Sequence, residues 1–120
     1  MKDVPILSLA YYGDAVVELL VREYLMSTGS FPPGELVKRS KNFVTCEAQS
    51  DAAERILGVL SEEELTFFKR GRNAKSHSTP KHGELIQYRR ATGFEALFGY
   101  LYLNGEEERA KDLFKIAFEL

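Results

Sequence analysis

The pattern of apolar and polar positions along this chain is helical almost from end to end. Apolar residues recur at spacings of three and four, the period of an amphipathic α-helix, and no segment alternates as a half-buried strand does. Pro5 suits the first turn of a long helix, which Gly29 and the turn at residues 30–34 end. A second long apolar helix is expected from about Glu84 to Leu103.

Shorter helices are expected between and after these two. Ser61 followed by Glu64 has the spacing of a capping box and opens one of them. Residues 71–83, rich in Gly, Asn, Ser, Thr, His and Pro, are expected to form a loop. The other short helices are predicted at residues 35–46 and 47–57, which read as two helices or one bent helix, and at residues 106–118 after a turn at Asn104-Gly105. The sequence therefore predicts an all-α fold with a single domain over residues 1–120.

Composition narrows the classes of function that fit. Hydrophobic residues make up 44% of the chain, enough for a core. Cys46 is the only cysteine, so no intramolecular disulfide forms, and we expect a small buried thiol in a reducing cytoplasm. We find no signal peptide, no membrane-spanning stretch, no zinc spacing of Cys and His, and no phosphate-binding or dinucleotide motif.

Two acids interrupt the apolar faces of the long helices. Residues seven apart lie on nearly the same helix face, and Asp14 is spaced seven from both Leu7 and Val21. Glu95 is likewise spaced seven from Tyr88 and Tyr102. A carboxylate in a buried stripe needs compensation. It pairs with a buried arginine, caps another helix, or binds a metal, and the pattern alone favours structural pairing slightly.

Two further observations favour the metal hypothesis. Converging carboxylates from different helices are what Mg²⁺ uses in proteins. Glycines and alanines surround both acids, at Gly13 and Ala15 and at Gly93, Ala96 and Gly99. Small residues allow two helices to approach closely, so that their acids share one ion, although close packing alone explains them equally well.

The net charge of −2 hides an uneven distribution. Residues 69–90 carry seven cations and one anion, so this segment is +6 and the rest of the chain is −8. Such a concentration makes a phosphate-binding face on an acidic protein. A solvated loop with scattered lysines is an equally weighted alternative on charge alone.

Three motifs together resemble the ribonuclease III family. Leu9–Glu18, Leu-Ala-Tyr-Tyr-Gly-Asp-Ala-Val-Val-Glu, resembles its signature helix, whose core is Leu-Glu-x-x-Gly-Asp-Ala. Thr92–Leu103 resembles its second acidic helix, Asp-x-x-Glu-Ala-Leu-x-Gly-x-x-Tyr-Leu, and Arg70–Lys81 resembles the basic loop of its Mini-III branch. The chain departs from the four-acid family pattern at Ala10 and Thr92, where the family has acids, and this two-acid pattern itself resembles Mini-III.

The resemblance implies a homodimeric endoribonuclease that cleaves double-stranded RNA to leave 5′-phosphates, with no separate double-stranded-RNA-binding domain. It implies Asp14 and Glu95 as catalytic ligands of Mg²⁺, for which Mn²⁺ would substitute, and Glu18 as a residue that orients a metal-bound water. The implied substrate is a base-paired stem of precursor 23S ribosomal RNA. The implied RNA-binding residues are Arg70, Arg72, Asn73, Lys75, Ser76, His77 and Lys81.

Two other classes of function compete with the nuclease. A non-catalytic duplex-RNA-binding or ribosome-associated dimer is favoured by the loss of two acids, whereas retention of both Asp14 and Glu95 favours the enzyme. A helical protein-interaction module leaves the +6 segment unexplained.

Overall fold

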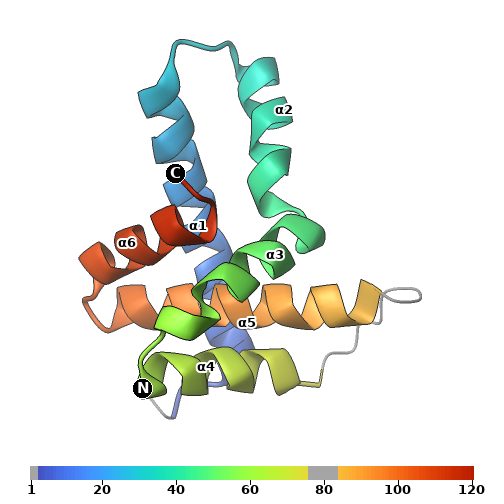
Figure 1. Ribbon diagram of the computed structural model, residues 1–120, viewed down its shortest axis with the longest axis vertical. Helices are drawn as coiled ribbons and strands as arrows, with labels where there is room; N and C mark the ends of the chain where they lie inside the picture. Colours follow the sequence, from blue (N-terminus) through green and yellow to red (C-terminus); the bar gives the residue numbers. More distant parts are fainter. Residues whose placement is uncertain (1–2, 76–83) are drawn as a thin grey trace.

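The computed structural model describes residues 3–75 and 84–120, and these residues form an all-helical domain around one central helix (Figure 1). Its principal extents are 41 × 35 × 24 Å. The helices are α1 (Ile6–Thr28), α2 (Pro33–Val44), α3 (Cys46–Ile56), a short 3₁₀ helix η1 (Leu57–Val59), α4 (Glu62–Asn73), α5 (Glu84–Leu103) and α6 (Glu107–Ala117). The predicted all-α fold is confirmed, and α5 has the bounds expected from the sequence.

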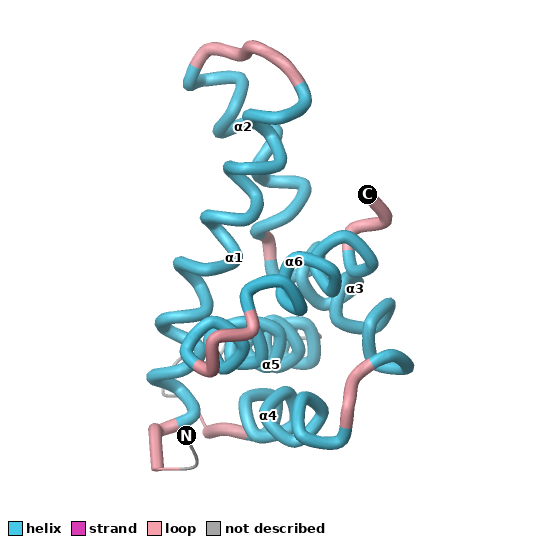
Figure 2. Tube along the Cα trace, turned by 90° about the vertical axis from the view of Figure 1, so that its left-hand side faces the viewer, coloured by secondary structure: helices cyan, strands magenta, loops and turns pink. Residues whose placement is uncertain are grey.

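Helix α5 lies at the centre and packs against α1, α3, α4 and α6. Its face toward each neighbour is apolar, which is why its sequence is hydrophobic all around rather than along one stripe. Phe94, Leu97, Phe98 and Leu101 of α5 are fully buried. Figure 1 and Figure 2 show α1 crossing α5 partway along its length and running on beyond it, so that the last turns of α1 and the N-terminal part of α2 project from the body as a hairpin.

Local signals explain where several helices begin. The Ser61 hydroxyl accepts from the Glu64 amide at 3.1 Å and the Glu64 carboxylate accepts from the Ser61 amide at 2.8 Å, so the predicted capping box is confirmed. The Thr45 hydroxyl caps α3 by accepting from the Ala48 amide. Residues 35–57 are therefore two helices, not one bent helix. Gly105 has a φ of 74°, which suits the turn into α6.

Three predictions about local structure were wrong. The turn after α1 is shorter than expected, because Pro33 already begins α2. The loop predicted from residue 71 begins only after Asn73, because Gly71 packs directly on α5 and keeps α4 helical there. Cys46 is exposed rather than buried, because it lies at the start of α3 away from the core.

No helix in the described ranges is long and apolar enough to cross a membrane.

Candidate active site

Helices α1 and α5 cross with their backbones in contact, and the crossing lies beside both predicted acids. Gly13 is buried at this point, and a Cβ atom built on it would lie 1.6 Å from the carbonyl oxygen of Glu95. Real Cβ atoms essentially never approach another atom within 3.0 Å. The absence of a side chain at Gly13 therefore allows the residue that follows it, Asp14, to lie beside Glu95.

The carboxyl groups of Asp14 and Glu95 meet across this crossing. Burial raises the pKa of Glu95 to about 9, and a hydrogen bond from the protonated Glu95 carboxyl group to the Asp14 carboxylate, together with the negative charge of Asp14, acts in the same direction. The pair therefore holds a proton at neutral pH. In the described part of the chain, no lysine or arginine forms an ion pair with either acid. The structural pairing with a buried arginine that the sequence pattern slightly favoured is not found there.

The apolar stripe in which Asp14 was placed is only partly buried by this chain, because Val21 is fully buried and the N-terminal part of the stripe is exposed. Asp14 is exposed, as are Leu7 and Tyr11, whose exposed fractions are 41% and 85%. The core-facing side of α1 is instead lined by Leu9, Gly13, Val17 and Val21. The expectation that Glu95 lies in a buried stripe agrees better with the structure, because its side chain is partly buried between buried neighbours on α5.

The positions where the family pattern has two further acids offer no metal ligand. Ala10 is buried on α1 and has no polar side chain. Thr92 lies one turn before Glu95, and its hydroxyl donates to the carbonyl oxygen of Tyr88 at 3.0 Å. Among the described residues, no group of three or more acids, histidines or cysteines is placed to hold a metal ion. The site thus consists of two carboxylates, and any further ligands come from outside this set.

Glu18 lies one helical turn after Asp14, as predicted, and has a partner on its own helix. Its carboxylate accepts from the Arg22 guanidinium at 3.1 Å, and the Arg22 side chain is exposed while that of Glu18 is half-buried. An exposed ion pair of this kind contributes less than about 1 kcal/mol, so it leaves Glu18 able to move.

The C-terminal turn of α4 carries cations and contacts α5 near Thr92. A Cβ atom built on Gly71 would lie 3.1 Å from the carbonyl oxygen of Thr92, so α4 touches α5 one turn before Glu95. Arg70 and Arg72 flank Gly71 in the sequence. The Arg70 guanidinium lies 5.3 Å from the centre of the Phe67 ring, a contact that supports its stem.

The structure describes some of the remaining predicted RNA-binding residues but not all of them. Arg72 donates from its Nε atom to the Asn73 side-chain oxygen at 3.1 Å, and both Asn73 and Lys75 are exposed. Ser76, His77 and Lys81 lie outside the described residues. Four of the seven predicted residues therefore lie at or just after the end of α4. All four are close in sequence to Gly71, which contacts α5.

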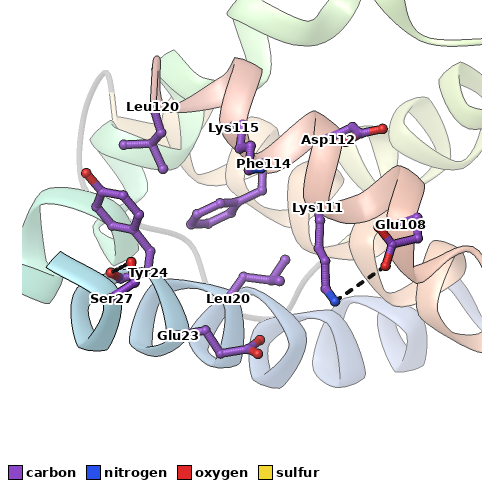
Figure 3. Close-up of a pocket in the computed structure, with 10 residues that line it drawn as sticks. All are labelled: Leu20, Glu23, Tyr24, Ser27, Glu108, Lys111, Asp112, Phe114, Lys115 and Leu120. Carbon is purple, nitrogen blue, oxygen red and sulfur yellow. Dashed lines mark hydrogen bonds and ion pairs between the residues drawn. The ribbon is translucent and has the colours of Figure 1, made fainter.

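A separate groove of about 610 Å³ lies between α1 and α6, and neither acid of the pair lines it (Figure 3). Its floor is apolar, with Leu20 and Phe114, and its rim carries the Lys111–Glu108 ion pair at 3.6 Å. The sequence analysis did not single out this groove, because its residues come from helices at opposite ends of the sequence.

Comparison with known proteins gives consistent results. The model of the Ribonuclease III domain family matches residues 7–106. A protein named Mini-ribonuclease 3 from Brevibacillus brevis is 45% identical over 114 residues, which are 95% of this chain and 85% of that protein. Its namesake from Enterococcus faecalis is 44% identical, over 89% of this chain and 83% of that protein.

A solved structure has the same fold. The crystal structure of protein FN1578 from Fusobacterium nucleatum superimposes with a TM-score of 0.85 at 33% sequence identity, over 98% of this chain and 94% of that one. The arrangement of helices around α5 is therefore shared with an experimentally determined protein.

Proposed function

Since the chain belongs to the ribonuclease III family, we propose that it cuts double-stranded RNA with Mg²⁺ held by Asp14 and Glu95. Members of this family are endoribonucleases that act on double-stranded RNA and generally need a divalent metal ion, and this chain is such an endoribonuclease. The observation that carries the choice of site is the meeting of two carboxyl groups, from α1 and α5, with no cationic side chain to neutralise them in the described residues.

The chemistry of this pair fits a divalent ion. A cation between the two carboxyl groups would displace the proton of Glu95 and offset the burial that raises its pKa. Mg²⁺ is commonly held by one or two carboxylates, with water and substrate phosphate as its other ligands. When bound, it supplies a nucleophilic water near neutral pH and neutralises charge on the scissile phosphate. The role of Asp14 and Glu95 is to place that chemistry at one point, and Glu18 would orient the attacking water.

The cations at the end of α4 are proposed to bind the RNA backbone. Duplex RNA is recognised mainly through its shape, phosphates and 2′-hydroxyls. Arg70, Arg72 and Lys75 would bind phosphates, and Asn73 would donate to phosphate or 2′-oxygens. Ser76, His77 and Lys81 are proposed as further contacts. The contact of Gly71 with α5 near Thr92 supports this arrangement, because these cations are close to Gly71 in the sequence.

A homodimer is proposed to form through the exposed apolar stripe on α1. Leu7, Tyr11, Ala15 and Leu19 are spaced four residues apart, all are exposed, and Met26 continues the stripe. A patch of this kind on an otherwise polar surface is typical of an interaction site. A twofold axis through it would give one acid pair for each RNA strand.

Sedimentation tests the dimer. The expected mass is twice 13.6 kDa, and Leu19→Ser, on the stripe, should weaken association. Val59→Ser is the matched control, because Val59 lies off α1 and the exposed fractions of the two side chains are 49% and 48%. An active monomer at micromolar concentration would exclude the model of one site per strand.

The natural substrate is proposed to be a base-paired stem of precursor 23S ribosomal RNA, cleaved in the cytoplasm. This part of the proposal rests on the resemblance to Mini-ribonuclease 3 proteins. Primer extension on ribosomal RNA from cells that lack the protein would test it, because extended 23S ends are expected.

The central experiment is incubation with long duplex RNA and Mg²⁺, with and without EDTA. The wild-type protein should give short duplex products only without EDTA. Asp14→Asn and Glu95→Gln should abolish cleavage and keep the circular dichroism of the folded helices, because neither change leaves an unpaired buried charge. Glu108→Gln, an exposed acid on α6, is the control that should cleave normally. Full cleavage by Glu95→Gln would refute the proposed site, and products in EDTA would refute the metal requirement.

A further inference from the structure

We propose that Gly13 and Gly99 are positioning residues that set the spacing of the two carboxylates, and so the Mg²⁺ requirement of the enzyme. The proposal rests on the proposed function, because it takes Asp14 and Glu95 as the metal-binding pair. On this proposal, Gly13 and Gly99 govern the reaction although they touch neither metal nor RNA.

The two glycines face each other across the crossing of α1 and α5. A Cβ atom built on Gly13 would lie 2.9 Å from the Gly99 amide nitrogen, and one built on Gly99 would lie 3.1 Å from the Gly13 amide nitrogen. The shortest distances are 1.6 Å, from Gly13 to the Glu95 carbonyl oxygen, and 2.1 Å, from Gly99 to the Leu9 carbonyl oxygen. All of these neighbours are backbone atoms, which cannot turn aside as a flexible side chain does.

The position of this contact gives it a role beyond packing. Gly13 precedes Asp14, and the atom nearest to it belongs to Glu95 itself. Gly99 lies one turn after Glu95. A change in the separation of the helices at this point is therefore transmitted to both carboxylates over a single residue or a single turn.

The metal chemistry is sensitive to such a change. Mg²⁺ requires near-octahedral geometry with ligands at about 2.0–2.1 Å, so the spacing of two carboxylates on separate helices affects how well both can bind one ion. Relieving the 2.1 Å contact to at least 3.0 Å moves the backbones apart by roughly 1 Å. A misplacement of about 1 Å in a catalytic constellation costs on the order of 100-fold in rate.

A second glycine crossing provides the control. Gly93 and Gly71 bring α4 against the other side of α5, and a Cβ atom on Gly93 would lie 2.7 Å from the Phe68 carbonyl oxygen. Gly93→Ala therefore strains a helix crossing of the same kind, but one that α1 and Asp14 do not share. A purely structural role for the glycines predicts similar defects at both crossings.

The experiment compares Gly99→Ala with Gly93→Ala in the full chain, measuring thermal stability, RNA binding in EDTA, and cleavage rate across a Mg²⁺ titration. We expect Gly99→Ala to raise the half-saturating Mg²⁺ concentration severalfold and to cut the rate about 100-fold, with RNA binding in EDTA unchanged. For Gly93→Ala we expect lost stability but the wild-type half-saturating Mg²⁺ concentration. The same shift in both variants, or in neither, would overturn the proposal.

Asp14→Glu keeps the inference testable if Gly99→Ala fails to fold. Asp14 is exposed, so this change lengthens one carboxylate without disturbing the backbone. Alone it should raise the half-saturating Mg²⁺ concentration. Where Gly99→Ala folds, the double variant should partly restore the wild-type value, because the longer side chain spans the wider gap. An Asp14→Glu enzyme with the wild-type Mg²⁺ dependence would refute the spacing argument.

Failure of the proposed function would look different. Glu95→Gln would then cleave RNA with the wild-type Mg²⁺ dependence, whatever the glycine variants do.

Discussion

The salt dependence of RNA binding gives the sharpest test of the cationic end of α4. Arg72 and Lys75 are replaced by Ala in one double variant, and Lys111 and Lys115 of α6 in the other. Each pair holds one half-buried and one exposed side chain, and each double variant loses two positive charges. The two proteins therefore have the same net charge of −4, and differ only in where the charges were removed.

The magnitude follows from counterion release. Each phosphate contact contributes about 0.9 to the slope of log affinity against log salt, by analogy with B-form DNA. If Arg72 and Lys75 each bind one phosphate, the first double variant should lose about 1.8 from the slope. Over a fourfold change in salt, such as about 50 to 200 mM, this amounts to roughly tenfold in relative affinity. The α6 variant should keep the wild-type slope, with at most a small uniform loss from its changed net charge.

Fluorescence anisotropy with a labelled RNA duplex, in EDTA to prevent cleavage, measures both slopes. Duplexes of unrelated sequence should be affected alike, because phosphate contacts carry no sequence information. Equal slopes for the two double variants would refute the assignment, since the effect would then come from net charge. A flatter slope for the α6 variant instead would place the RNA over the groove of Figure 3.

The remaining predictions concern stability and metal affinity. Arg109 donates two hydrogen bonds to the Glu64 carboxylate, which is only 6% exposed. Arg109→Ala should therefore lower the free energy of unfolding by about 3 kcal/mol and the melting temperature by roughly 10 °C. Lys111→Ala, which removes an exposed ion pair, should change the melting temperature little. Because these bonds hold the pKa of Glu64 below its ordinary value of 4.5, their contribution is present above that pH and is lost as the pH falls through the folded-state pKa. Glu64→Gln should therefore flatten the acid side of the stability profile, and a profile that keeps its slope would contradict this. Thr92→Asp should lower the Mg²⁺ concentration for half-maximal binding in calorimetry, but it need not speed cleavage. Equally tight binding to the wild-type protein and to Thr92→Asp would mean that unidentified ligands fill the site.

The capping box at the start of α4 illustrates how far the sequence reaches. Ser61 and Glu64 are three residues apart, so their reciprocal hydrogen bonds depend on local geometry alone and were predicted correctly. The bonds from Arg109 to the same carboxylate span 45 positions and were not foreseen. Many exposed arginines were available as partners, and nothing in their spacing distinguishes this one.

Gly71 shows the opposite limit, where tertiary packing overrides a local signal. Gly, Arg and Asn in succession read as the beginning of a loop, because glycine costs about 1 kcal/mol in a helix interior. The close contact of Gly71 with Gly93 and Ala96 on α5 keeps that turn helical. No local pattern indicates that this glycine is required for contact with another helix rather than for a turn.

The apolar stripe around Asp14 shows how a partly wrong premise led to one acid of the proposed site. Periodicity identifies a face that avoids water, but it does not say whether the same chain or another molecule covers that face. Leu7, Tyr11 and Leu19 remain exposed, so the energetic argument for a buried Asp14 fails in the single chain. The argument holds for Glu95, whose burial raises its pKa. Asp14 is exposed on the stripe proposed to form the dimer, and Glu95 is desolvated on the central helix. The proposed metal site therefore lies where the core meets the proposed dimer surface.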